Sequence, residues 1–213
     1  RGLGDVYKRQ DKMTKQIIFD VGANSGTSCV HYTEDPNFIV YAFEPTPHLL
    51  ENYLYPQQKE NYIVVPYAIS DFNGEATFNV AGQEDWGCSS LHEFSDNLNL
   101  TWPGRQDFKV TESITVNVQR MDTFIENNNI EYINFLHCDT QGNDLKVLES
   151  FGKYIDILQS GVVEASNQNP LYKDVDNSVT SIINFLEGNN FMVGKITPND
   201  GHYNEVNIEF KKV

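Results

Sequence analysis

The sequence predicts an α/β fold with a mainly parallel sheet and helices on both faces. Short apolar, β-branched or aromatic runs alternate with helix-like stretches through most of the 213 residues. This alternation is typical of β-α-β units, whose strands run parallel and whose helices cover the sheet. The strands expected from it are Gln16–Asp20, Ile39–Phe43, Ile63–Pro66, Ile133–Cys138 and Ile157–Glu164.

Two apolar stripes at helical spacing predict helices between these strands or after them. One stripe consists of Leu49, Leu50, Tyr53 and Leu54, with Thr46 as the expected N-cap and Pro47 as the first helical residue. The other consists of Val175, Val179, Ile182, Ile183 and Leu186 and ends at Gly188, which favours a helix C-terminus.

Two regions interrupt the alternation of strands and helices. Glu75–Val80 and Ser113–Val118 alternate apolar and polar residues, as half-exposed antiparallel strands do. The mostly polar residues between them, about 81–112, are expected to form a small β and loop insertion. Near the end, Phe191–Ile196 and Val206–Phe210 flank the turn-rich segment TPNDGHYN and predict a hairpin that closes the sheet.

The chain length and the lack of a linker predict a single domain over residues 13–213. The first twelve residues, RGLGDVYKRQDK, match no periodic element and precede Met13. We interpret residues 1–12 as a non-native or disordered tail and leave them out of the fold prediction. An ordered N-terminal arm is the alternative.

The composition argues against two classes of partner. Thirty acidic residues against fifteen basic ones give a net charge of −15, which repels phosphate backbones, and no basic patch compensates for it. No apolar run approaches the roughly 18 residues of a membrane-spanning helix. We therefore expect neither a nucleic-acid nor a membrane partner. The distant cysteines Cys29, Cys88 and Cys138 lack a CxxC pattern, which is typical of thiols in a reducing cytoplasm.

The stretch IIFDVGANSG is an expected strand that ends in Asp20 and breaks into small residues. Gly22 and Gly26 permit backbone angles and a ligand approach that a Cβ atom would block. A dinucleotide fold prefers G-x-G-x-x-G, but here the spacing differs and Asn24 replaces the central glycine. An acid at the strand end also suits a cationic ligand better than a phosphate. A purely structural turn is the alternative.

The next two expected strands end in residues that suit a nucleoside. Glu44 ends the second strand, where an acid in a doubly wound sheet accepts the hydroxyls of a ribose. Ala68, Ile69 and Ser70 follow the third strand, at the edge where an adenine ring can lie. Asp71 belongs either to this site or to an ordinary β-turn.

Six segments in order resemble the FkbM-type S-adenosylmethionine-dependent methyltransferases. They are FDVGANSG, YAFEPTP, YAISDFNGEATF, CSSL, VQRMDTFIE and INFLHCDTQGNDLKVLES. The resemblance extends from about Ile17 to the final hairpin. It implies a Rossmann-like, seven-stranded class I methyltransferase sheet whose last strand runs antiparallel. It also implies transfer of the sulfonium methyl group of S-adenosyl-L-methionine, usually to a hydroxyl of a small molecule or sugar.

The same resemblance assigns roles to individual residues. Those implied to hold the methionine part of the cofactor are Asp20, Gly22, Ala23, Asn24 and Gly26. Glu44, with Pro45 beside it, is implied to hold the ribose, and Ile69 and Ser70 to flank the adenine. Asp139 is implied to face the donor methyl group. The family commonly carries lysine two residues before this aspartate, where this chain has His137.

Asp139 and His137 are the catalytic candidates. Asp139 follows His137 by two residues, so their side chains point to the same face if the strand continues to Asp139. His137 is a candidate general base, because a hydroxyl loses its proton as it becomes an ether, or else a packed core histidine. An Mg²⁺ site of Asp139, Glu164 and Asn167 is conceivable by ligand type, but the family pattern gives it no support and we predict no metal. Cys138 is expected in the core.

The insertion is the predicted source of acceptor selection. Gln83–Arg105 is long and polar, interrupts a regular pattern, and is expected to cover the cofactor cleft. Trp86 and Trp102 within it either stack on a substrate ring or attach the loop to the body, and His92 either reaches the acceptor or is exposed. The leading functional prediction is an O-methyltransferase. The alternatives are a nicotinamide-nucleotide oxidoreductase and a cofactor-binding module without catalysis.

Overall fold

The computed structural model of the protein describes residues 15–82 and 86–213. The expected tail of residues 1–12 and the first residues of the expected insertion, 83–85, lie outside the described residues.

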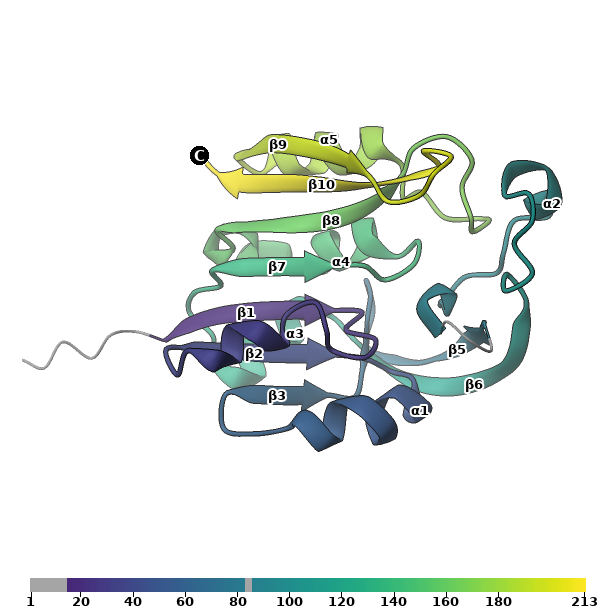
Figure 1. Cartoon of the computed structure of the whole chain (residues 1–213). Coiled ribbons are helices and arrows are strands. Elements are labelled where there is room, and N and C mark those ends of the chain that lie inside the picture. Colours follow the sequence, from purple (N-terminus) through teal and green to yellow (C-terminus); the bar gives the residue numbers. More distant parts are fainter. Residues whose placement is uncertain (1–14, 83–85) are drawn as a thin grey trace, which may run out of the picture.

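A seven-stranded sheet forms the centre of the molecule, in the order β3-β2-β1-β7-β8-β10-β9 (Figure 1). Its strands are β1 (Gln16–Val21), β2 (Phe38–Phe43), β3 (Tyr62–Val65), β7 (Phe135–Cys138), β8 (Ser160–Ser166), β9 (Phe191–Pro198) and β10 (Glu205–Lys212). Neighbours from β3 to β8 pair in parallel, whereas β10 pairs antiparallel with β8 and β9. The predicted sheet, with its antiparallel last strand, is confirmed.

Helices cover both faces of this sheet (Figure 1). The elements on one face are α3 (Met121–Asn128), α4 (Asp144–Ser150) and α5 (Val179–Gly188), with the 3-10 turn η5 (Gly152–Ile157) after α4. Those on the other are η1 (Val30–Glu34), α1 (Pro47–Leu49), the π-helix η2 (Leu50–Leu54) and η3 (Tyr55–Gln57).

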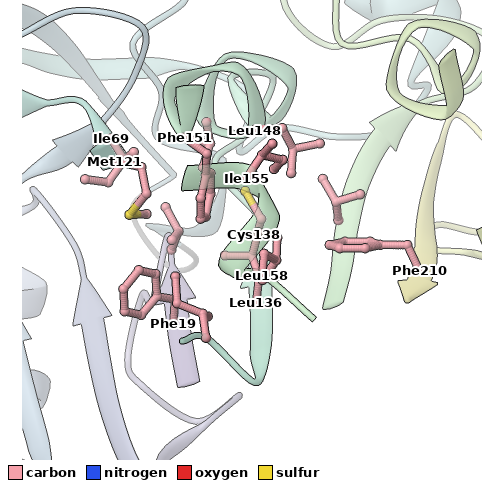
Figure 2. Close-up of a cluster of buried hydrophobic side chains, with 14 of the residues drawn as sticks. Phe19, Ile69, Met121, Leu136, Cys138, Leu148, Phe151, Ile155, Leu158 and Phe210 are labelled. Atoms are coloured by element: carbon pink, nitrogen blue, oxygen red, sulfur yellow. The ribbon is translucent and has the colours of Figure 1, made fainter. Parts of the chain in front are cut away.

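The main hydrophobic core lies between the sheet and the face of α3, α4 and α5 (Figure 2). Phe19 and Leu136 reach it from the sheet, and Leu148 and Phe151 reach it from α4 and its C-terminal end. Ile18, one residue before Phe19, belongs to the second core on the other face because successive strand residues point to opposite faces. Burial on both faces explains why these strands are continuous apolar runs.

The first predicted helix differs from a regular α-helix. After α1 it widens into the π-helix η2, so that Leu49, Leu50 and Leu54 are buried while Tyr53 is 44% exposed. Tyr53 belongs to the expected apolar stripe but faces solvent, because the spacing of a π-helix differs from that of an α-helix. Thr46 occupies the N-cap position, but its side chain forms no capping hydrogen bond.

The starts of α5 and β8 also differ from the predicted boundaries. Val175 lies outside α5, which begins after Ser178, whose hydroxyl accepts a hydrogen bond from the amide of Ser181. A serine cap stops the helix from extending back to Val175. Ile157 was expected in a strand but ends the 3-10 turn η5, so β8 begins at Ser160.

A second, three-stranded sheet lies beyond the carboxyl ends of the parallel strands (Figure 1). Its strands are β4 (Ala68–Ile69), β5 (Gly74–Ala81) and β6 (Val110–Gln119), and β5 and β6 pair antiparallel as predicted. The segment between β5 and β6 contains the short helices η4 (Trp86–Cys88) and α2 (Leu98–Thr101).

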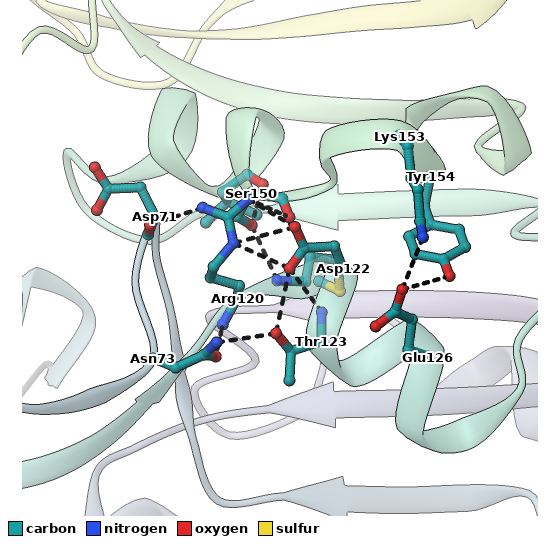
Figure 3. Close-up of polar contacts among 11 residues, drawn as sticks. Asp71, Asn73, Arg120, Asp122, Thr123, Glu126, Ser150, Lys153 and Tyr154 are labelled. Carbon is teal, nitrogen blue, oxygen red and sulfur yellow. Dashed lines mark hydrogen bonds and ion pairs between the residues drawn. The ribbon is translucent and has the colours of Figure 1, made fainter.

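Arg120 ties this second sheet to the body of the molecule (Figure 3). Its amide donates to Asn73 Oδ1 at 2.9 Å and its Nη1 to the carbonyl of Asp71 at 2.7 Å, both between β4 and β5. Its Nη2 pairs with the Asp122 carboxylate in α3 at 2.7 Å. Arg120 thus connects the β4–β5 turn, the end of β6 and α3 through its backbone amide and its side chain.

The three cysteines are all buried, and no disulfide joins them. In the portion of the chain that the structure describes, no helix is long and apolar enough to cross a membrane.

Gly161 provides a test of how closely β7, β8 and β10 pack. A Cβ atom there would lie 2.4 Å from the carbonyl oxygen of Leu136 and 2.6 Å from the Phe210 ring. We expect Gly161→Ala to lower the free energy of unfolding by about 1–3 kcal/mol, measured by urea denaturation. The matched control is Gly194→Ala in β9, where the nearest atom is at 3.4 Å. Equal effects at both positions would contradict the packing argument.

Candidate active site

The turn after β1 brings bare backbone to the edge of the sheet. Gly22, Asn24 and Gly26 have φ angles of 79°, 51° and 82°, which favour glycine or asparagine. A Cβ atom on Gly22 would lie 1.9 Å from the carbonyl oxygen of Asp139, and one on Gly26 would lie 2.3 Å from the Tyr62 hydroxyl. Gly22 therefore lets β7 approach, and Gly26 lets the turn pack on β3.

Glu44 holds this turn in place. Its Oε2 accepts a hydrogen bond from the amide of Asn24 at 3.0 Å, and its Oε1 accepts one from the amide of Thr46 at 2.8 Å. Burial raises the pKa of Glu44 to about 7, although these hydrogen bonds work in the opposite direction. Because a carboxylate offers about four acceptor positions, two remain for a ligand.

A cavity of about 320 Å³ opens beside the turn. The predicted site residues that line it are Gly22, Ala23, Asn24, Glu44, Pro45, Ile69, His137 and Asp139. Asp20, Gly26 and Ser70 are not among its lining residues. Ser70 instead donates to Asp71 Oδ1 at 3.2 Å and to Asn143 Oδ1 at 3.3 Å.

Asp20 lies behind His137 rather than on the cavity wall. The two residues are paired across β1 and β7, and Asp20 Oδ1 lies 2.8 Å from His137 Nδ1. Burial alone would lower the pKa of His137, but the hydrogen bond and charge of Asp20, with the charges of Asp139 and Asp144, raise it above its usual value. The pair therefore favours a protonated imidazole at the cavity.

Asp139 belongs to a hydrogen-bonded chain that ends in a buried acid. Gln141 Nε2 donates to Asp139 Oδ1 at 2.7 Å and to Glu164 Oε2 at 3.2 Å. The Tyr172 hydroxyl lies 2.9 Å from Gln141 Oε1 and orients the amide. Burial, followed by the charge of Asp139, raises the pKa of Glu164 well above its usual value. Gln141 thus separates two carboxyl groups that would otherwise repel each other.

Asp144 shapes the loop that carries Asp139. Its Oδ1 accepts hydrogen bonds from the amide and hydroxyl of Thr140 at 2.8 and 2.9 Å, and its Oδ2 accepts one from Asn177 at 2.9 Å. Burial and the charge of Asp139 raise the pKa of Asp144 to about 6. The second acid of the D-x-Q-G-x-D segment therefore supports the loop and does not reach the cavity.

The insertion contacts this loop directly. Ser90 Oγ donates to the carbonyl of Gln141 at 2.6 Å, and His92 Nε2 lies 3.1 Å from Asn143 Oδ1. Burial lowers the pKa of His92, which is half-buried. His92 does not line the cavity described above or the second cavity described below. Its contact with Asn143 attaches the insertion to the body. Gly87, Ser89 and Leu91 line the first cavity, as expected for a segment that covers it.

A second cavity of about 260 Å³ adjoins the first. The two share Gly87, Asp139 and Gln141 as lining residues. Trp102 lines the second cavity while packing edge-on against Phe108, with ring centroids 5.3 Å apart. It therefore both attaches the insertion and faces the cavity. The side chain of Trp86 lies outside what the structure describes.

The conceivable Mg²⁺ ligands do not converge. Both Glu164 oxygens accept hydrogen bonds from amides, of Asn199 and Gln141, and Asn167 donates to the carbonyl of Tyr203. Within residues 15–82 and 86–213, the one group with metal-ligand spacing is Asp20, Cys29 and His137. Burial raises the pKa of the Cys29 thiol, and Asp20 raises it further, which disfavours the thiolate that a metal would need.

Gln141 and Glu205 are two of the cavity-wall residues that the sequence analysis did not single out. Gln141 lies inside the segment INFLHCDTQGNDLKVLES, which resembles the family. Its position between Asp139 and Gly142 is the sequence feature that could have marked it as a site residue. Glu205 lies at the start of β10 and lines the second cavity. No local pattern marks it, because β10 reaches the site only through its antiparallel place beside β8.

A seven-stranded sheet with one reversed strand and a cavity at its carboxyl edge defines the class I methyltransferase fold. Residues 20–193 match the family described as the methyltransferase FkbM domain, so the chain belongs to the FkbM methyltransferase family. It is a methyltransferase that uses S-adenosylmethionine. A search of curated proteins finds no significant match.

Solved structures show the same fold at low sequence identity. One is a fibrillarin/Nop5p complex, with 12% identity, a TM-score of 0.53, and coverage of 95% of this chain and 74% of that one. Another is a Methanococcus jannaschii fibrillarin pre-rRNA processing protein, with 15% identity, a TM-score of 0.52, and coverage of 93% of this chain and 67% of that one. At such identities the likeness concerns the fold alone.

The cavity residues fit this cofactor. Glu44 keeps acceptor positions for ribose hydroxyls, and Ile69 offers an apolar surface to a ring. Gly22 and Asp139 line the cavity side by side, because the missing Cβ of Gly22 lets the Asp139 backbone approach. S-adenosylmethionine supplies a methyl group on a positively charged sulfur.

Glu44→Ala tests the ribose contact. We expect S-adenosylhomocysteine to bind more than about tenfold more weakly, because charge-assisted hydrogen bonds contribute about 1.5–3 kcal/mol each. Isothermal titration measures the affinity, and circular dichroism checks the fold. The control is Glu51→Ala, an exposed acid of η2. Unchanged affinity in a folded Glu44 variant would remove Glu44 from the site.

Proposed function

We propose that the protein methylates a hydroxyl oxygen of a small molecule or sugar. The carrying observation is that Asp139 lines both cavities, so a donor in the first and an acceptor in the second would meet at its carboxylate. In methyl transfer to oxygen, the C–O bond forms as the S–C bond breaks, and the hydroxyl proton passes to a base. Correct orientation contributes at best roughly 7–11 kcal/mol to such a reaction.

The residues around the two cavities have separate roles in this reaction. Asp139 is anchored by Gln141 and orients the acceptor hydroxyl. His137 takes the hydroxyl proton at the ring nitrogen not bonded to Asp20, directly or through water. The covering segment with Gly87 and Ser89 excludes water and selects the acceptor. Family membership removes the oxidoreductase alternative, whereas binding without catalysis remains an outcome of the tests below. We place the reaction in the cytoplasm, where buried thiols stay reduced.

Asp139→Asn should cut turnover about a hundredfold or more, in line with the 10²–10⁴ that a positioned acid–base group contributes. The measurement is release of S-adenosylhomocysteine with a hydroxyl acceptor that the parent enzyme turns over. Asp35→Asn, an exposed acid at the opposite end of the sheet, is the control. If Asp139→Asn retains parental turnover, Asp139 is a structural turn residue.

His137→Gln should remove the acid limb of the kcat–pH profile. Asp20 raises the pKa of His137 above the ordinary histidine value of about 6.5. The neutral base therefore becomes available only above that pH, and kcat should rise as the pH increases beyond it. Asp20→Asn should move the limb to lower pH. An acid limb in His137→Gln that matches the parent's would exclude this histidine as the titrating base.

A further inference from the structure

The wall of the second cavity carries more acidic than basic groups. Asp139, Asp200 and Glu205 line it, with Arg105 as a basic neighbour. Arg105 forms two hydrogen bonds with Asp107, at 2.8 Å from Nε and 2.5 Å from Nη2, so a carboxylate outside the wall offsets its charge. The wall therefore carries three carboxyl groups against one guanidinium that is already paired.

Glu205 differs from the other buried acids of the site. It is only 9% exposed, and its carboxylate accepts no hydrogen bond from any residue that the structure describes. Glu44 and Glu164 each accept two such bonds. Glu205 lines the second cavity, so its carboxylate is held among buried neighbours while its open side faces the cavity. A ligand that donates hydrogen bonds would satisfy it.

The rest of the wall suits the carbon skeleton of a small cation. Trp102 contributes an aromatic ring and Leu171 an apolar side chain, whereas the guanidinium of Arg105 already lies over the Phe108 ring, 4.1 Å from its centroid. Aromatic faces attract ammonium groups as well as apolar carbon. A volume of about 260 Å³ lies just below the range usual for small-molecule sites, which favours a small acceptor.

We propose that the acceptor carries an amine, that Glu205 and Asp200 bind it as an ammonium group, and that a hydroxyl of the same molecule reaches Asp139. The substrate class is an amino alcohol or amino sugar. This inference rests on the proposed methylation of a hydroxyl and specifies its substrate.

The charge state of Glu205 agrees with such a ligand. Burial, together with the charges of Asp139, Asp144 and Asp200, raises the pKa of Glu205 to about 8. An ammonium group beside it favours the ionised form, so binding near neutral pH releases a proton.

The test uses the whole protein saturated with S-adenosylhomocysteine and three probes of similar size. Ethanolamine carries an ammonium and a hydroxyl, ethylene glycol is neutral, and glycolate is an anion. The melting temperature is followed against probe concentration at constant pH and ionic strength. We expect a saturable rise with ethanolamine, a smaller one with ethylene glycol and none with glycolate.

Glu205→Gln should abolish the preference for ethanolamine. The matched control is Glu209→Gln, an exposed acid on the same strand, which should keep it. Without probes, Glu205→Gln should melt at a higher temperature than the parent at pH above about 8, because it removes a buried charge. A lower melting temperature would indicate a structural carboxylate and overturn the proposal.

Other outcomes are equally decisive. No shift with ethanolamine in the parent, or an undiminished shift in Glu205→Gln, overturns the proposal. So does a larger Glu205-dependent shift with Mg²⁺, which would assign the carboxylate to a metal. If ethanolamine binds but no hydroxyl acceptor is methylated, the proposed function fails while the ammonium site stands. If amine-free alcohols are methylated as efficiently as amino alcohols, the proposed ammonium site fails while the proposed hydroxyl methylation stands.

Discussion

The close approach of the β1 and β7 backbones at their carboxyl ends positions the whole site. It depends on Gly22, since a Cβ atom there would overlap the carbonyl oxygen of Asp139. The amide of Asp139 in turn donates to the carbonyl of Val21 at 3.0 Å. With the strands in this register, Asp20 and His137 stand opposite each other and form their hydrogen bond. The same approach places Asp139 where the two cavities meet.

Short sequence motifs predicted those residues of the site that lie at the ends of strands. The glycine turn, Glu44 and Asp139 follow strands that end at one edge, so topology alone brings them together. The exact partners depend on side-chain packing, which the sequence pattern does not encode. Asp20 was assigned to the cofactor because it ends a strand, yet its side chain is covered by His137 from the neighbouring strand. The apolar stripe with Tyr53 likewise does not show that this side chain faces solvent, since a π-helical turn changes the spacing of the stripe.

The site gathers buried acids at a cost to the fold. Asp20, Glu44, Asp144 and Glu164 are all at most 5% exposed. Most of them are held by hydrogen bonds, which is how a fold tolerates buried carboxylates. Glu205 accepts no such bond from the described residues, whereas Glu164, which Gln141 connects to Asp139, has two amide donors. Because Glu205 lines the second cavity, a ligand there can supply the hydrogen-bond donors that Glu205 does not receive from these residues.

The raised pKa values of the buried groups at the site all make the fold less stable as pH rises. Asp144, Glu44 and Glu205 are raised to about 6, 7 and 8, and His137 is raised as well. A group whose pKa is higher in the folded than in the unfolded state contributes stability that is lost as pH rises through the folded value. We therefore expect the ligand-free fold to weaken between about pH 4, where unfolded carboxyls titrate, and about pH 8. His137 becomes a competent base only above its ordinary pKa, and Glu205 gains the charge that binds a cation near pH 8. The conditions that weaken the empty site are those that favour its chemistry.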